Sequence, residues 1–389
     1  MEMTSFERVK AALEHREPDR VPFDLGGSVL TGMNRHCYSK LRDHLGLPER
    51  EIQIQDAMQQ LARIDDDAAA YLKTDVGCVD PQPPSSPGLA KAPVIDGDYY
   101  SMTDEWGIEW KMPASGGHYF DMADQPLKAA ETAADLERFP WPDPSDPARY
   151  VALKQSADRF VHEQKKAYIL GRQYAGIWET ALWMSGFEKF FMDMLTNESY
   201  AHALMNKITE LKMEYWGNAL DAVGENVLIM SEADDLATQS SLLCSVDLYK
   251  KMVHPYHKRL FDYVKKKAAS KVYIFYHSCG AVKPLIPYLI EEGVDILNPV
   301  QVNADGMNTA ELKREFGKDI TFWGGGVDTQ QILPFGTPQQ VRDEVKRRID
   351  DLAPGGGFVF ASVHNVQSDV PPQNFMAMWE TLREHGVYH

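Results

Sequence analysis

The chain has 389 residues, of which 44% are hydrophobic and 25% are charged. This composition is typical of a folded globular protein with room for a barrel-sized core or two smaller domains. The formal net charge of −17 argues against a nucleic-acid or anionic-membrane partner, because such partners require a basic face.

The N-terminal part of the chain alternates between helix and strand signals. Thr4 and Glu7 form a capping-box pattern, which predicts a helix that runs to about His15. Residues 21–27 end in two glycines and predict a strand followed by a turn. We expect two further helices, at about residues 34–45 and 54–72.

Residues 81–150 differ from the rest of the chain, because prolines and aromatic residues are interspersed there. A hairpin is expected around Asp96-Gly97. We interpret this region as an insertion with rigid connectors within a single barrel domain that covers residues 1–389.

From about residue 151 onward, apolar runs alternate with amphipathic helical stretches. The runs lie at residues 167–174, 227–231, 271–276, 296–300, 320–323 and 357–361. Together with runs near Val21 and Val76 they predict about eight parallel strands, the number in a (β/α)8 TIM barrel of the α/β class. An open doubly wound sheet is the competing architecture, but the chain has no GxGxxG fingerprint.

The cysteines and the N-terminus indicate the cellular compartment in which we expect the protein. The four cysteines, which include no CxxC pair, predict free thiols in a reducing environment. The N-terminus lacks a signal-peptide pattern, and no apolar run is long enough to span a bilayer. We therefore expect a soluble, cytoplasmic protein.

Unusual polar residues follow the predicted strands, and catalytic groups of a TIM barrel lie where strands end. These residues are Asp24, Asp75, Asp80, Arg172, Tyr174, Glu232, Asp234, Asp235, His277, Cys279, Asn298, Gln301, Asp328, His364 and Asn365. A helix cap or a solvated loop explains any one of them, for instance Asp328 before Thr329. It does not easily explain why all of them share this position.

His277 and Cys279 are two residues apart, so in an extended chain their side chains share one face and are able to bind one metal ion. A thiolate beside an imidazole favours zinc. His364 is a third candidate ligand and Glu232 a fourth, or a residue that orients another ligand. The alternatives are a packed thiol with a hydrogen-bonded His277, and a His364 that acts as a general acid or is structural.

Several segments together resemble the uroporphyrinogen decarboxylase superfamily. They are RVPFD (20–24), GRQYAGIW (171–178), EADDLATQ (232–239), YHSCG (276–280), ILNPVQ (296–301), FWGGGVDT (322–329) and GGGFVF (355–360). The His-x-Cys-Gly element is similar to that of the zinc-dependent, corrinoid-linked methyltransferases. The resemblance implies a (β/α) barrel, zinc as cofactor, and cobalamin carried by a separate corrinoid protein.

The chain departs from both branches of the superfamily. The arginine-rich element that grips porphyrinogen carboxylates in the decarboxylases is absent. The second cysteine of the thiol-methylating members is replaced by His364. A zinc ion with fewer thiolates is a stronger Lewis acid, so the resemblance favours demethylation of a small aryl methyl ether.

On this hypothesis the metal ligands are His277, Cys279, His364 and Glu232. Candidate catalytic residues are Asp235, Asp75 and Arg172, and candidate substrate-binding residues are Asp24, Tyr174, Asn298 and Trp323. The alternative is metal-free decarboxylation of a pyrrole or aromatic acid, with Asp75 stabilising the protonated ring, His364 assisting proton transfer and Arg172 holding a carboxylate. A non-catalytic barrel is the third hypothesis.

Overall fold

A parallel seven-stranded sheet, with strand order β14-β13-β12-β11-β10-β9-β4, forms the centre of the molecule. The structure is a computed structural model that describes residues 2–117 and 119–389. The strands are β4 (Val76–Val79), β9 (Ala167–Leu170), β10 (Ile229–Ala233), β11 (Tyr273–His277), β12 (Ile296–Asn298), β13 (Thr321–Trp323) and β14 (Phe358–Val359).

Residues 21–24 close this sheet into a barrel. Phe23 forms a parallel bridge with Phe360, and the Asp24 amide donates to the Phe360 carbonyl at 2.9 Å. On the other side, the Asp75 amide donates to the Phe23 carbonyl at 2.8 Å. The segment thus fills the gap between β14 and β4 as the eighth strand, and the predicted TIM barrel is confirmed.

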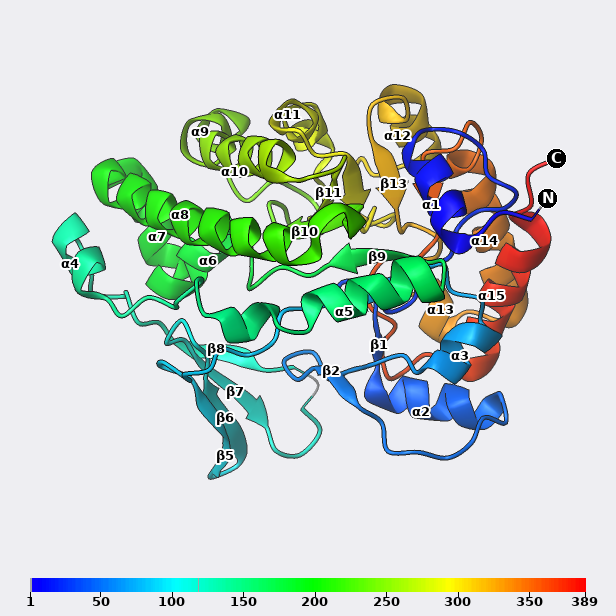
Figure 1. Cartoon of the computed structure of the whole chain (residues 1–389), viewed down its shortest axis with the longest axis horizontal. Helices are drawn as coiled ribbons and strands as arrows, with labels where there is room; N and C mark the ends of the chain where they lie inside the picture. The colour runs from blue at the N-terminus through cyan, green and yellow to red at the C-terminus, as the bar shows by residue number, and fades with distance from the viewer. Residues whose placement is uncertain (1, 118) are drawn as a thin grey trace.

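Helices connect successive strands and surround the sheet, as Figure 1 shows. They are α5 (Leu153–Asp158), α6 (Ile177–Ser185), α7 (Phe187–Thr196), α8 (Glu198–Val223), α9 (Val246–Met252), α10 (His254–Lys267), α11 (Ile286–Glu292), α12 (Thr309–Phe316), α13 (Ile332–Phe335), α14 (Pro338–Leu352) and α15 (Pro372–His385). None of the described helices combines the length and the apolar character needed to cross a bilayer.

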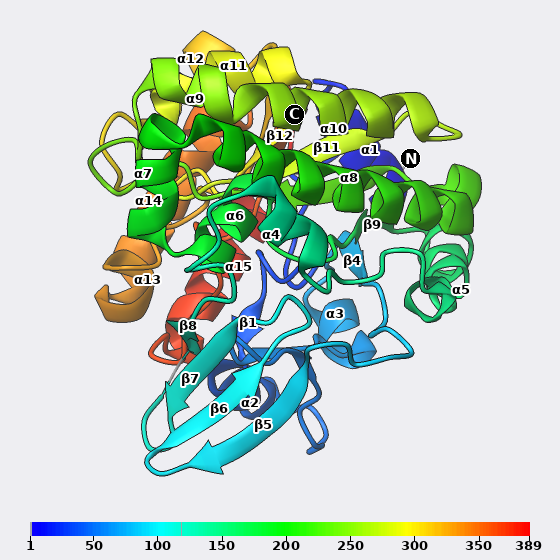
Figure 2. The same cartoon turned by 90° about the vertical axis from the view of Figure 1, so that its left-hand side faces the viewer.

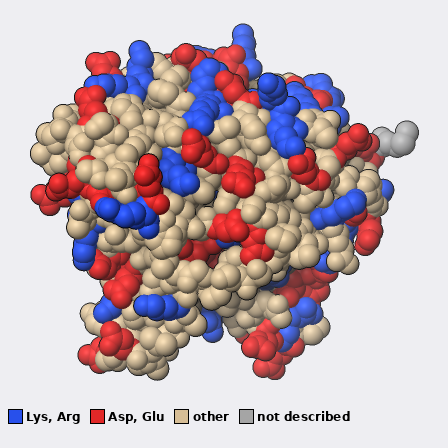
Figure 3. Space-filling model, turned by 60° about the vertical axis from the view of Figure 1, so that its left-hand side comes forward, with Lys and Arg blue, Asp and Glu red and all other residues tan. Residues whose placement is uncertain are grey.

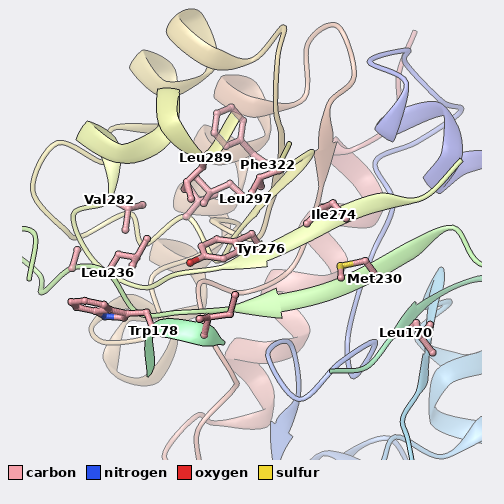
Figure 4. Close-up of a cluster of buried hydrophobic side chains, with 14 of the residues drawn as sticks. Leu170, Trp178, Met230, Leu236, Ile274, Tyr276, Val282, Leu289, Leu297 and Phe322 are labelled. Atoms are coloured by element: carbon pink, nitrogen blue, oxygen red, sulfur yellow. The ribbon is translucent and has the colours of Figure 1, made fainter. Parts of the chain in front are cut away.

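The side chains of each strand alternate between the barrel interior and the helix layer. Ile229, Phe275 and Trp323 belong to the interior cluster. The residues that point outward pack under the helices (Figure 4), and they include Leu170, Met230, Ile274, Tyr276, Leu297 and Phe322. This alternation determines which polar residues at the strand ends face the barrel mouth.

The N-terminal region differs from the expectation at one element. The helices α1 (Ser5–Leu13), with its capping box, and α2 (Arg35–His44) form as predicted. Residues 54–72 do not form one helix: β2 (Ile54–Asp56) and β3 (Leu61–Ala62) pair antiparallel, β1 (Met33–Asn34) joins them, and only α3 (Asp66–Tyr71) is helical. Gln60 has a φ of 56°, which a helix cannot accommodate.

Residues between β4 and β9 contain a separate antiparallel sheet that projects from the barrel (Figure 2). Its strands are β5 (Lys91–Asp96), β6 (Tyr99–Thr103), β7 (Glu109–Pro113) and β8 (Asp121–Asp124), and α4 (Ala133–Arg138) follows. The predicted hairpin is present, and Gly97 takes the φ of 59° that its turn requires.

Charged side chains of both signs are interspersed on the face drawn in Figure 3, where red acidic groups gather near a central hollow. Basic side chains form no continuous field on that face. The net negative charge of the chain is therefore not offset there by a concentrated basic surface.

Helix α1 closes the amino-terminal end of the barrel, where Val9, Ala12 and Leu13 join the interior cluster. Asp75, which directly precedes β4, lies at this end and is fully buried. Its carboxylate accepts from Arg8 at 2.8 Å and from Arg20 at 2.7 Å. The prediction of Asp75 as a catalytic residue is wrong, because it lies at the opposite end of the barrel from His277 and serves a buried ion-pair network.

We expect Asp75→Asn to lower the free energy of unfolding by about 3 kcal/mol or more, because it leaves two guanidinium groups without their buried partner. Urea denaturation measures this. Asp96→Asn, at an exposed ion pair with Lys111, is the matched control and should have a much smaller effect. Equal stability of Asp75→Asn and the wild type would contradict the assignment.

Candidate metal centre and substrate cavity

His277, Cys279 and His364 come together at the carboxyl-terminal mouth of the barrel. One donor atom from each lies within 4.8 Å of the others. The Sγ atom of Cys279 is 3.5 Å from Nε2 of His277, and the two imidazole rings have centroids 5.6 Å apart. His277 points inward because it has the same parity as Phe275 on β11, and Cys279 follows directly after the strand.

Asn298 sets the orientation of the His277 ring. Its Oδ1 atom lies 2.5 Å from Nδ1 of His277, while its Nδ2 atom donates to the carbonyl of Trp323 at 2.8 Å. This pattern fixes the amide, places the imidazole proton on Nδ1 and leaves the Nε2 lone pair free. The prediction of Asn298 as a substrate-binding residue is wrong, because the side chain is fully buried and both of its polar atoms are used.

The loop that carries Cys279 is held by two further contacts. The Cys279 amide donates to Oδ1 of Asp235 at 2.8 Å, and the Gly280 amide donates to Oε1 of Gln301 at 2.8 Å. Gly280 has a φ of 88°, and backbone carbonyls of the neighbouring loop surround its Cα. The turn after β11 therefore requires glycine at this position.

Burial sets the protonation of the cluster. It lowers the pKa of His277 to about 4, with a further decrease from the charge of His364 that the carboxylate of Asp235 opposes. Burial also lowers the pKa of His364 and raises the pKa of the Cys279 thiol. Both imidazoles are thus neutral, the form that binds a metal, and the thiol loses its proton only when a cation is near.

Two carboxyl groups lie beside the cluster. Asp235 lies two residues after β10, with Oδ1 4.0 Å from Nε2 of His277 and its side chain 44% exposed. Glu179 is in the first turn of α6. Burial, followed by the negative charges of Asp235 and Asp234, raises the pKa of Glu179 well above its ordinary value. The sequence analysis did not identify Glu179. Its position immediately after the segment 171–178 is the signal that could have identified it.

A buried network supports this side of the site. Asp234 accepts from the amides of Trp178 and Glu179 at the start of α6, and its Oδ2 lies 2.8 Å from Nε2 of His257. His257 also contacts Glu292 at 3.4 Å. Although burial disfavours the imidazolium, Glu292 and Asp234 together raise the pKa of His257 to about 10. The cation between two carboxylates therefore fixes α6 against β10.

A cavity of about 520 Å³ opens at the same end of the barrel. Arg172 and Tyr174, in the loop after β9, line it together with residues of the inserted region, among them Trp110 on β7 and Phe120 just before β8. The Tyr174 hydroxyl bonds to Asp104, and its ring stacks on Trp106 at 5.2 Å. Residues of the inserted region thus form one wall of the cavity. The catalytic role predicted for Arg172 and the substrate-binding role predicted for Tyr174 stay predictions.

Glu232 is not a ligand of the cluster, contrary to the prediction. Strand β10 extends to Ala233, so Glu232 lies within the strand, opposite Tyr276, and faces the helices. Its carboxylate pairs with Nζ of Lys212 at 2.9 Å and accepts from Nε1 of Trp216 at 2.6 Å, both on α8. Lys212 and Glu232 are each about 2% exposed, so this is a buried structural ion pair.

The structure places Asp24 and Trp323, two of the predicted substrate-binding residues, in contact with each other, and their predicted role stays a prediction. Nε1 of Trp323 donates to Oδ2 of Asp24 at 2.9 Å, and the two side chains are 0% and 1% exposed, respectively. Burial raises the pKa of Asp24 to about 6. Both residues are part of the barrel interior and do not line the cavity.

These features define a closed (β/α)8 barrel with a nitrogen and sulfur donor cluster at its mouth. The family model of uroporphyrinogen decarboxylase (URO-D) matches residues 99–385, and the chain belongs to this family.

Relatives within the family carry two kinds of name. A methylated-thiol–coenzyme M methyltransferase of Methanosarcina mazei is 23% identical over 282 residues, which are 69% of this chain and 68% of that protein. A uroporphyrinogen decarboxylase of Alkalilimnicola ehrlichii is 23% identical over 306 residues, 75% and 76% of the two chains. A solved methyltransferase from Methanosarcina mazei shares the fold, with 19% identity, a TM-score of 0.64 and coverage of 98% and 99%.

We expect His257→Gln to lower the free energy of unfolding by about 3 kcal/mol at pH 6, because two buried carboxylates lose the cation between them. The pKa of His257 rises from 6.5 to about 10 on folding, so the stabilisation is complete below about pH 6.5 and is lost as the pH rises through about 10. The deficit should therefore shrink between pH 6 and pH 9 in urea unfolding. His162→Gln, at an exposed histidine, is the control. A deficit that is the same at both pH values would contradict this assignment.

Proposed function

We propose that this protein is a zinc-dependent methyltransferase that moves a methyl group from a small aryl methyl ether to the cobalamin of a separate corrinoid protein. The observation that carries the proposal is the convergence of His277, Cys279 and His364 within 4.8 Å at the barrel mouth. The methyltransferase names of two relatives support the same reaction class.

The donor set fits zinc. Two neutral imidazoles and one thiol supply three ligands, which is the usual number in a catalytic zinc site and leaves one position for substrate. Asn298 already orients one of the imidazoles. One thiolate rather than several leaves the metal a stronger Lewis acid, which suits an ether oxygen better than a thiolate nucleophile. When bound, zinc would polarise the ether oxygen and stabilise the phenolate that departs.

The residues of the chain have separate roles in this reaction. The oxygen-to-methyl bond of the substrate breaks, its electron pair stays on the oxygen, and the methyl group passes to the reduced cobalt that the partner carries. Burial and the negative charges of Asp235 and Asp234 raise the pKa of Glu179, which favours its protonated form, and in this proposal Glu179 supplies that proton to the phenolate oxygen. Asp235 holds the Cys279 loop through the backbone amide.

Metal-free decarboxylation of a pyrrole or aromatic acid is the alternative, and the relatives named uroporphyrinogen decarboxylase favour it. Its proposed ring-stabilising acid, Asp75, is however at the far end of the barrel in ion pairs with Arg8 and Arg20. Release of carbon dioxide from a porphyrinogen, without dependence on zinc or on a corrinoid, would favour this alternative.

We expect purified wild-type protein to contain zinc in an equimolar amount, as measured by mass spectrometry of the elements. The double variant His277→Ala, Cys279→Ala should lose it, because two of three donors are removed. Cys244→Ser, which removes a thiol elsewhere, should retain it. Wild-type protein that does not bind zinc, or undiminished zinc in the double variant, would refute the proposed metal centre.

We expect Glu179→Gln to slow methyl transfer from a methoxyaromatic donor to cob(I)alamin by about 10²-fold or more, because the amide cannot supply a proton. The absorbance change of the cobalamin measures the rate. Zinc content should be unchanged, and Glu188→Gln on α7 should transfer methyl groups at the wild-type rate. A wild-type rate in Glu179→Gln would remove the general acid from the proposal.

A further inference from the structure

Arg172 differs from the buried arginines of this protein. Arg8, Arg42, Arg149 and Arg348 each pair with a carboxylate. Within residues 2–117 and 119–389, Arg172 forms no ion pair, and its buried Nε atom has no acceptor. A guanidinium that is partly buried without a partner is costly, so the position favours an anion supplied from outside the chain.

The backbone at Arg172 is fixed, so the guanidinium is presented rather than left mobile. The Gly171 amide donates to the Val79 carbonyl at 2.9 Å, and the Tyr215 hydroxyl donates to the Gly171 carbonyl at 2.7 Å. A Cβ at Gly171 would lie 2.2 Å from the Asp80 carboxylate, so a larger residue does not fit there. Arg172 therefore enters the cavity from a rigid strand end.

One wall of the cavity is aromatic. Tyr174 packs edge-on against Trp183 with ring centroids 5.7 Å apart, and Trp183 packs against Trp110 at 5.4 Å. Tyr174 is held in place by its bond to Asp104. Flat apolar rings are the ligands that such surfaces bind best.

The acidic residues of the cavity do not cancel the charge of Arg172. Asp104 already accepts from Tyr174, from Nε1 of Trp110 and from two backbone amides. Asp80 accepts from Cys78 and Gln55. Asp56 accepts from the Gln59 amide at 2.9 Å. One unpaired cation among satisfied acids matches a monoanion rather than a phosphate dianion.

Arg172 and the donor cluster lie at the same end of the barrel. Arg172 follows β9 and His277 ends β11, and β10 pairs with both of these strands. The anion site and the donor cluster therefore face the same mouth of the barrel.

We infer that Arg172 binds a carboxylate of the substrate, so that the substrate is a methoxylated aromatic carboxylate whose ring packs on the Tyr174, Trp183 and Trp110 wall. The inference rests on the proposed function for the methoxy group. The carboxylate site and the aromatic wall are inferred from the residues of the cavity and do not depend on the proposed function.

Calorimetric titration with a matched pair of ligands, 4-methoxybenzoate and the neutral 4-methoxybenzyl alcohol, tests the inference. A charge-assisted bond of about 1.5–3 kcal/mol predicts that the wild type binds the carboxylate about 10- to 100-fold more tightly. Arg172→Gln should abolish this preference and leave the affinity for the alcohol unchanged, and Arg172→Lys should restore part of it. Binding of the alcohol also reports that the cavity of the variant is folded.

Arg159→Gln is the control, because it removes the same charge at an exposed ion pair with Asp66. It should keep the full preference. Equal binding of both ligands by the wild type, binding of neither, or an equal loss of both in Arg172→Gln would overturn the inference.

Methyl transfer is measured separately in the same proteins. Transfer to cob(I)alamin without preference for the carboxylate would refute the role of Arg172 and leave the proposed function intact. Carboxylate binding through Arg172 without any transfer would refute the proposed function and retain the anion site.

Discussion

The pairing register between β10 and β11 determines which polar groups face the mouth of the barrel. Glu232 lies opposite Tyr276, and Ala233 lies opposite His277. Because side chains alternate along a strand, this register directs Glu232 into the helix layer and His277 into the barrel. A one-residue slip of β10 would turn Glu232 away from Lys212 and into the barrel, whereas a slip of β11 would turn His277 into the helix layer and remove the first imidazole of the donor cluster.

Buried charges surround the site and hold its backbone in place. Lys212 and Glu232 tie α8 to β10, and the Asp234–His257–Glu292 array ties α6 and α10 to the same strand end. Breaking such pairs is costly because an uncompensated charge remains in a region of low dielectric constant. Asp235, in contrast, is about half exposed beside this buried network.

The cavity combines two regions of the chain with different structures. Strand ends of the barrel provide Arg172 to the cavity and hold the donor cluster at the same mouth, whereas the inserted region provides aromatic residues such as Trp110 and Phe120. The family relatives include both a methyltransferase and decarboxylases, so the barrel alone does not select the reaction. The choice of reaction depends on the donor cluster and on the residues that the inserted region adds to the wall of the cavity.

The sequence by itself determined the alternation of strands and helices, hence the barrel, and the pairing of His277 with Cys279, because both depend on local spacing. Only the tertiary structure decided that His364 joins them, since this contact links residues 85 positions apart along the chain through barrel closure. It also turned Glu232 into the helix layer, buried Asp24, Asn298 and Trp323, and placed Asp75 at the opposite end of the barrel. For Glu232 the physical reason is strand parity, because β10 extends two residues beyond the apolar run that predicted it. For Asp24, Asn298 and Trp323 it is the set of buried hydrogen bonds that they form, and for Asp75 it is its place before β4 rather than after it.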